Sequence, residues 1–203
     1  MIREPRFTDD VAALPTYKFG PSSLTWWGII GYMLIEGAAF ALAFAAYFFL
    51  MGHEQGWPPE GRQAPTLVAG TLFTLLILLS EIPNTAIKKA AVSGDVPAIR
   101  RLMPVMVAVG AALLVIRAFE FNSLNCRWTD NAYASIIWAL LLLHTAHILT
   151  DWLDTVVLWA LIRTPLAYEG RRQVDVDENA LYWRYVWLLW IPIYLMIYWV
   201  PRL

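Results

Sequence analysis

Two histidines and two aspartates lie close together in one otherwise apolar stretch, at positions 144, 147, 151 and 154. At about 100° per residue, these side chains fall within about 80° of a helix surface, which predicts one polar stripe along a helix. Imidazole and carboxylate groups on one helix face can bind a metal ion or relay protons. The same stripe can instead hydrogen-bond to a neighbouring helix. Both interpretations apply to His144, His147, Asp151 and Asp154.

The remaining metal-binding side chains do not favour a metal or heme site. A heme held between two helices needs a histidine from each, but His144 and His147 share one helix and His53 falls in a predicted loop. Cys126 is the only cysteine of the sequence, so neither a cysteine-based metal cluster nor an intrachain disulfide can form. We therefore expect no metal and no cofactor in this chain.

A single carboxyl group, that of Glu36, lies near the middle of the first long apolar stretch. A charge inside a membrane span costs about 2.5–3.5 kcal/mol on insertion scales, so it needs a structural or functional reason. The sequence places no basic residue within one helical turn of Glu36. We expect its carboxyl group either to form a hydrogen bond to a neighbouring helix, or to handle protons or face lipid.

Polar residues also follow one face of the second apolar stretch. Thr74, Glu81, Asn84 and Lys88 recur at spacings that place them on the same side of a helix. Pro83 is expected to loosen the backbone among them. We expect this face to form a polar seam against another subunit, with Glu81 and Lys88 extending toward the cytoplasmic side.

A charged pair lies near the end of the third apolar stretch. Arg117 and Glu120 are three residues apart, a spacing at which two helical side chains can pair. Their position predicts an ion pair at the membrane–water interface, at the outer end of this helix, rather than a catalytic site.

The apolar stretches that carry these residues are the dominant feature of the sequence. Of the 203 residues, 59% are hydrophobic and 15% are charged, against about 45–50% and about 25% in soluble domains. Five stretches reach the roughly 20 apolar residues that a membrane-crossing helix needs, and they are continuous rather than alternating as in a membrane β-barrel. These stretches are residues 24–51, 66–90, 97–121, 132–162 and 180–200. The sequence predicts an all-α membrane protein that folds as a five-transmembrane-helix bundle.

Charge predicts the orientation of this bundle and excludes one class of partner. Residues 1–23 form a polar tail, and residues 24–203 form the transmembrane domain. Basic residues gather at the end of the bundle where the chain begins: Arg3, Arg6, Lys18, Lys88, Lys89, Arg100, Arg101, Arg163, Arg171 and Arg172. The N-terminus is therefore expected in the cytoplasm and the C-terminus in the periplasm. A net charge of −1 argues against nucleic-acid binding.

Four segments, in order, resemble subunit III of the heme-copper oxidases, the cytochrome c and quinol oxidases. They are WWGIIGYMLIEGAAFALAFAAYFFL, RAFEF, LLLLHTAHILTD and ALYWRYVWLLWIPIYLMIYWV. Glu36 falls on the membrane-buried glutamate of the family, Glu120 on its glutamate–aromatic ending, and His144 and His147 on its His-x-x-His helix. Arg184 stands where many members have histidine, and Glu81 and Pro83 match no family position. Five helices correspond to shorter bacterial forms that lack the first two.

The resemblance implies a non-catalytic accessory subunit of a respiratory terminal oxidase. Such a subunit has no catalytic site, packs on catalytic subunit I and other oxidase subunits, and supports proton uptake and operational stability. Heme and copper are then expected in the catalytic subunit. Arg163 and Tyr32 match positions near bound phospholipid, and the expected location is the bacterial cytoplasmic (inner) membrane. Glu36, His144, His147 and Glu120 are the buried polar candidates for a proton-related role.

Two other functions remain open at this point. A subunit III-like partner of a nitric oxide reductase would carry the same motifs. A small proton-coupled transporter would use the buried polar residues as a pathway, although the sequence shows no internal repeat of the kind that often marks transporters.

Overall fold

The computed structural model describes residues 17–59 and 63–203. Most of the expected tail at residues 1–23 therefore lies outside the described residues, as do Arg3 and Arg6 of the predicted charge bias. Helix is the only regular structure in the described part of the chain, which confirms the all-α prediction. After a short 3-10 turn at Gly20–Ser22, the chain enters the first long helix at Leu24.

Five spans among the described residues are long and apolar enough to cross a membrane, as predicted. The helices are α1 (Leu24–His53), α2 (Leu67–Leu79), α3 (Glu81–Ser93), α4 (Val96–Asn122), α5 (Ala132–Ile162) and α6 (Gly170–Tyr194). Helices α2 and α3 together form the second span. The chain continues from α6 as a π-helical turn at Leu195–Trp199 and a 3-10 turn at Val200–Arg202.

The second span is interrupted at Ser80, where the sequence predicted one helix over residues 66–90. The cause is Pro83, which has no backbone N–H to donate to the carbonyl group four residues earlier. The Ser80 hydroxyl group donates to Ile77 O at 2.5 Å and accepts from Trp183 Nε1 at 2.8 Å. Helix α3 then ends at Gly94, whose left-handed backbone (φ 72°) suits a residue without a Cβ atom.

The last helix begins at Gly170, earlier than the predicted start at residue 180. The polar segment that looked like a loop is helical because its side chains have partners. Asp175 accepts from Arg172 at 2.8 Å, one turn away, and Asp177 lies 3.5 Å from Lys88 Nζ on α3. These contacts offset the charge that the segment brings toward the membrane.

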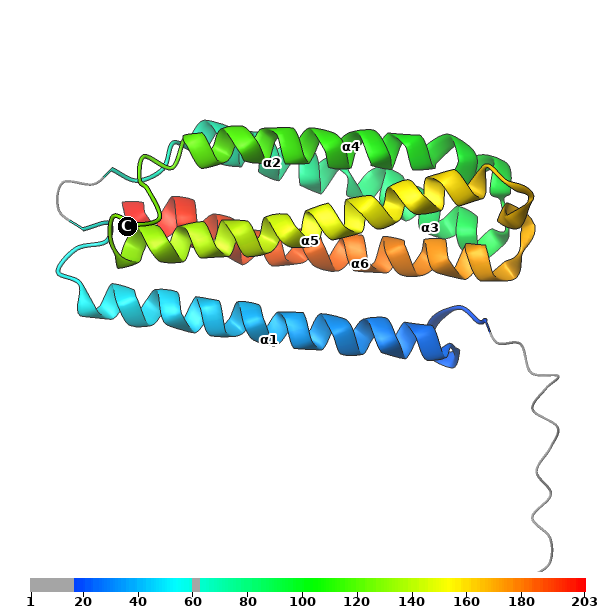
Figure 1. Cartoon of the computed structure of the whole chain (residues 1–203), viewed down its shortest axis with the longest axis horizontal. Coiled ribbons are helices and arrows are strands. Elements are labelled where there is room, and N and C mark those ends of the chain that lie inside the picture. Colours follow the sequence, from blue (N-terminus) through cyan, green and yellow to red (C-terminus); the bar gives the residue numbers. More distant parts are fainter. Residues whose placement is uncertain (1–16, 60–62) are drawn as a thin grey trace, which may run out of the picture.

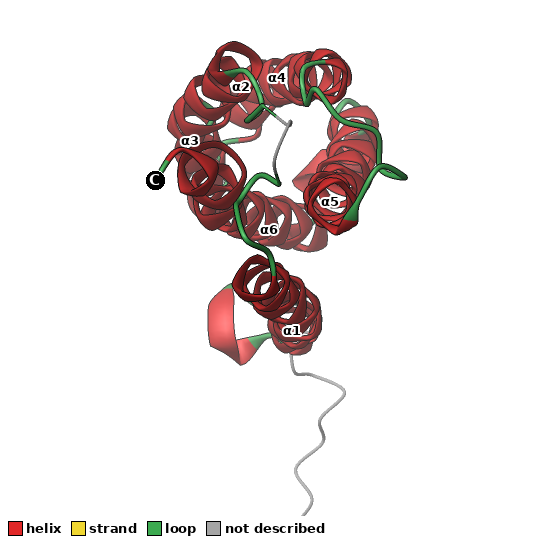
Figure 2. Cartoon of the chain, turned by 90° about the vertical axis from the view of Figure 1, so that its left-hand side faces the viewer, coloured by secondary structure: helices red, strands yellow, loops and turns green. Residues whose placement is uncertain are grey.

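The helices run side by side along the long axis, and the first described residues and the C-terminus lie at opposite ends (Figure 1). Seen end-on, α2 to α6 form a ring and α1 lies outside it, against α5 and α6 (Figure 2). The buried residues of α1 are Met33, Phe40 and Tyr47, spaced by seven. This spacing places one narrow face of α1 against the bundle and leaves most of the helix outside it.

Glycines allow two close helix contacts within the ring. A Cβ atom at Gly70 on α2 would overlap the ring of Tyr198, and a Cβ atom at Gly110 on α4 would overlap Trp152 on α5. The Trp152 Nε1 atom donates to Val107 O at 2.9 Å, so this indole sits directly against the backbone of α4.

Candidate functional site

Glu36 is the centre of a polar contact that joins α1 to α5 and α6. Its side chain is only 11% exposed. The Tyr182 hydroxyl group donates to Glu36 Oε2 at 2.7 Å, and His147 Nε2 lies 3.0 Å from Glu36 Oε1. The latter contact is an ion pair when both nitrogens of His147 are protonated. The expected hydrogen bond from Glu36 to a neighbouring helix is confirmed.

A pocket of about 390 Å³ lies beside this contact, between α1, α5 and α6. Tyr32 and Tyr182 line it, and their rings stack with centroids 5.9 Å apart. Its carboxylates are Asp151, Asp154, Asp175 and Glu178. Asp151 is 3% exposed; its Oδ1 atom accepts from Asn179 at 3.1 Å, while its Oδ2 atom has no hydrogen-bond partner among the described residues.

The predicted polar stripe on α5 meets two different neighbours. His147 faces Glu36 on α1, whereas His144 contacts α4 and α6. Arg117 donates to His144 Nδ1 at 3.0 Å, so the proton of a neutral imidazole is assigned to Nε2, which lies 3.0 Å from Val186 O. Both nitrogens of His144 are thus engaged inside the chain. Among the described residues, no three His, Cys, Asp or Glu side chains are grouped to hold a metal ion.

Arg117 and Glu120 form the predicted ion pair, but they do so inside the bundle. The two side chains are 1% and 0% exposed, and Arg117 donates to Glu120 Oε2 at 2.6 Å. Tyr198 donates to Glu120 Oε1 at 2.5 Å, and the guanidinium group lies between the rings of Phe73 and Trp190, at 3.8 and 4.4 Å from their centroids. These aromatic rings and the Tyr198 hydroxyl group enclose the pair within the bundle, and its position at the outer end of the span stays a prediction.

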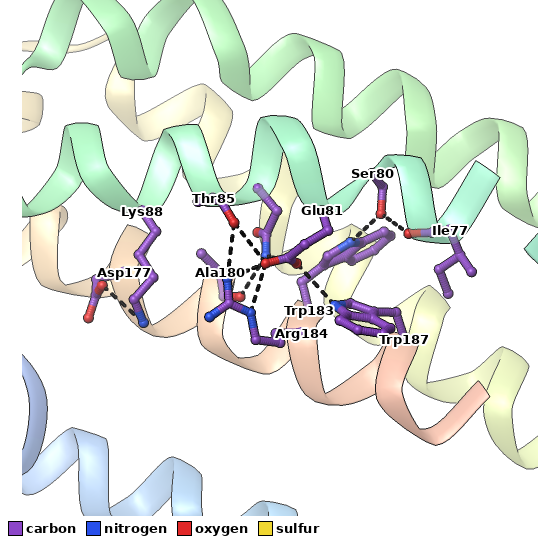
Figure 3. A network of polar contacts seen from close by, with 11 residues as sticks. Ile77, Ser80, Glu81, Thr85, Lys88, Asp177, Ala180, Trp183, Arg184 and Trp187 are labelled. Atoms are coloured by element: carbon purple, nitrogen blue, oxygen red, sulfur yellow. Dashed lines mark hydrogen bonds and ion pairs between the residues drawn. The ribbon is translucent and has the colours of Figure 1, made fainter. Parts of the chain in front are cut away.

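The polar face of the second span is directed at α6 of the same chain, not at another subunit (Figure 3). Asn84 donates to Ala180 O at 3.0 Å, and Thr74 accepts from Trp190 Nε1 at 2.8 Å. Glu81 accepts from Arg184 Nε at 2.8 Å. The prediction of a single polar face is confirmed, while its expected partner is corrected.

Tyr32 and Arg163, the two residues that match lipid positions of the family, have different surroundings. Tyr32 is exposed and lines the pocket beside Glu36. Arg163 is exposed at the end of α5, with its guanidinium group 3.9 Å from the ring centroid of Trp159. The basic residue that lines the pocket is Arg172.

Sequence reasoning did not single out Tyr182 or Asn179 as site residues. The sequence does carry a signal for them. Asp175, Asn179 and Tyr182 are four and three residues apart, a spacing that places them on one face of a helix. That face could not be recognised while residues 163–179 were taken as a connection.

Comparison with known proteins identifies a family for this arrangement. The family model described as "Cytochrome c oxidase subunit III" matches residues 21–201. The chain is similar to cytochrome c oxidase subunit 3 of Thermostichus vulcanus, with 28% identity over 86% of this chain and 87% of the relative. It is also similar to cytochrome c oxidase subunit 3 of Synechocystis sp., with 25% identity over 88% and 77%. A probable cytochrome c oxidase subunit 3 of Mycobacterium tuberculosis is 25% identical over 85% and 86%.

Proposed function

Because the chain belongs to the cytochrome c oxidase subunit III family, we propose that it is a non-catalytic accessory subunit of a respiratory heme-copper oxidase. It packs on catalytic subunit I, which holds the heme and copper, and supports proton uptake and operational stability. Its place is the bacterial cytoplasmic membrane, with the N-terminus in the cytoplasm. Phospholipid contributes to this role at Arg163 and Tyr32.

The engagement of the histidines within the spans supports the non-catalytic role. His144 is bonded to Arg117 and lies against Val186 O, and His147 contacts Glu36 and lies 2.6 Å from Leu143 O. Each imidazole therefore links helices or bonds to backbone. A redox centre would need these nitrogens as ligands, and binding one would break the contacts that join α1, α4, α5 and α6.

The Glu36 contact supports a stabilising role. It connects α1 to both helices on which α1 packs, and it lies beside a pocket wide enough for a ligand or water. A polar contact inside a membrane span is costly unless each group has a partner. Tyr182 donates to Glu36, and His147 Nε2 lies 3.0 Å from the same carboxyl group, so the first role of these residues is to hold α1 in place.

The test is purification of the tagged full-length chain from its native membrane in mild detergent. We expect a heme-copper catalytic subunit to copurify, seen as a Soret absorbance and by mass spectrometry. Copurification of a nitric oxide reductase catalytic subunit would show that the chain belongs to that complex and not to an oxidase. Purification as a pigment-free oligomer would overturn the proposal, and an unrelated tagged membrane protein from the same cells provides the control.

A further inference from the structure

A second pocket, distinct from the one beside Glu36, lies between α3 and α6. We call it the α3–α6 basic pocket; its volume is about 410 Å³. It is lined by Thr85, Lys88, Lys89, Val92, Ser93 and Arg184. Three of these six side chains are cationic and none is a carboxylate, so the pocket has the opposite charge character to the one beside Glu36.

The charges around the α3–α6 basic pocket sum to an excess of one positive charge. Two of the cations have carboxylate partners just outside it: Lys88 Nζ lies 3.5 Å from Asp177 Oδ1, and Arg184 is bonded to Glu81 (Figure 3). Lys89 is exposed and contacts no acidic side chain in the part of the chain that the structure describes. The site can therefore neutralise one negative charge of a ligand.

The donors that are left for such a ligand are the two ammonium groups and the Nη1 atom of Arg184, whose Nε and Nη2 atoms bind Glu81 and Thr85. The Thr85 hydroxyl group already donates to Glu81 Oε1 at 2.8 Å, and that of Ser93 donates to Ala90 O at 3.2 Å. Lys88 and Lys89 retain N–H groups that can donate to oxygen atoms of a phosphate. Lysine binds phosphate as a point charge and does not require the planar fit of an arginine.

The position of the pocket along the span indicates where the ligand comes from. The second span ends at Ser93, so Lys88 and Lys89 lie in its last turns, at the level of lipid headgroups. One turn from the lining residues Thr85 and Arg184, toward the middle of the span, two apolar side chains are exposed: Ile82 on α3 at 70% and Leu188 on α6 at 48%. A cationic end followed by an apolar strip matches the headgroup and acyl chain of a lipid.

We propose that the α3–α6 basic pocket binds the phosphodiester headgroup of an anionic phospholipid. Lys88 and Lys89 contact its phosphate, and one acyl chain lies along Ile82 and Leu188. A phosphodiester brings one negative charge and matches the single excess positive charge, whereas inorganic phosphate would bring about 1.5 to 2. The proposal does not depend on lipid binding at Arg163 and Tyr32, which belong to α5 and α1.

The test is native mass spectrometry of the full chain in nanodiscs of phosphatidylcholine, with and without added phosphatidylglycerol. Lys89→Gln is the main variant, because it removes the excess charge without breaking an internal contact. We expect about five-fold weaker phosphatidylglycerol retention, which corresponds to about 1 kcal/mol for one basic residue near the membrane surface. Arg101→Gln is the matched control, since Arg101 is an exposed cation at the same end of the bundle but does not line the pocket. Its retention should stay at the wild-type level.

Three outcomes would overturn the proposal. Equal loss in Lys89→Gln and Arg101→Gln would show diffuse attraction of anionic lipid instead of a site. Unchanged phosphatidylglycerol retention in Lys89→Gln would show that Lys89 does not contact the lipid. Displacement of phosphatidylglycerol by inorganic phosphate alone would assign the pocket to a soluble anion. Crosslinking of a photoactivatable phosphatidylglycerol to peptides of both α3 and α6, lost in Lys89→Gln, would support it independently.

Discussion

Arg184 on α6 binds the carboxylate of Glu81 on α3 through two of its nitrogens, directly beside the break in the second span. Thr85 and Trp187 bind the same carboxylate from either side, at 2.8 and 3.0 Å (Figure 3). The pair therefore fixes α3 to α6 at the point where α2 and α3 are no longer continuous.

The first prediction concerns this pair. Arg184→Gln leaves the Glu81 carboxylate with neutral donors only, so we expect the free energy of unfolding to fall by about 1–3 kcal/mol. Glu81→Gln should have a similar effect, and the double variant should lose less than the sum of the two. Unfolding of the four proteins in mixed micelles measures the coupling. Strictly additive losses would show that the two side chains do not stabilise each other.

The second prediction concerns the enclosed pair on α4. Arg117→Met leaves the Glu120 carboxylate without its cation in the bundle interior, at a cost of about 3–5 kcal/mol. Arg117→Met combined with Glu120→Gln removes both charges and keeps an acceptor for Tyr198, so it should recover most of the loss. The yield of folded protein and its unfolding in mixed micelles report on both variants. A double variant as unstable as Arg117→Met would contradict this account.

The third prediction concerns Glu36 and the attachment of α1. Glu36→Gln keeps an oxygen atom that can accept from Tyr182, so the oxidase should assemble and retain most of its initial turnover. Glu36→Ala leaves Tyr182 and His147 without this partner and should weaken the complex or shorten its active lifetime. Initial oxygen consumption and the inactivation rate in proteoliposomes distinguish the two. If Glu36→Gln stopped turnover at once in an assembled complex, the residue would be part of a proton path.

The fourth prediction uses two glycines with different surroundings. Gly70→Ala would push the ring of Tyr198 away from α2 and disturb its bond to Glu120, at a cost of about 1–3 kcal/mol for overpacking. Gly28→Ala on α1 meets nothing within 4 Å and should leave stability unchanged or slightly raised. Unfolding of both variants under the same conditions measures the difference. Equal stability would mean that the contact between α2 and Tyr198 relaxes without cost.

The fifth prediction tests the proposed lipid contact of Arg163. Arg163→Ala should release a phospholipid from the complex without preventing assembly, because one headgroup contact contributes about 1 kcal/mol. Arg163→Lys keeps the charge near the membrane surface and should retain the lipid in part, although it loses the stacking on Trp159. Native mass spectrometry counts the lipids in each complex. An unchanged count in Arg163→Ala would remove this residue from lipid binding.

Apolar length and polar spacing were enough to predict the five spans and the pairing of Arg117 with Glu120, because both depend on residues close in sequence. They could not show which neighbour each polar residue faces. His144 and His147 differ by less than a quarter of a turn, yet α5 lies between α1 on one side and α4 and α6 on others, so the two imidazoles reach different helices.

The pairing of Glu81 with Arg184 shows a similar limit. Neither residue follows the pattern of the family that the rest of the sequence resembles. Glu81 was assigned to a polar face expected to meet another subunit, and Arg184 was assigned no partner. Their contact joins residues 103 positions apart, a separation on which periodicity carries no information. The early start of α6 was missed for the same reason, since Asp177 has its partner, Lys88, on α3.

The packing of α1 against α5 and α6, which follow it late in the chain, also sets an order for biogenesis. A ribosome delivers α1 to the membrane first, but Tyr182, which donates to Glu36, is 146 residues further along the chain. His147 on α5, the other interhelical partner of Glu36, is 111 residues further along, so α1 has neither partner until α5 has been made and lacks Tyr182 until α6 follows. The first helix to be inserted therefore completes its packing only when the last helix, α6, has joined the bundle.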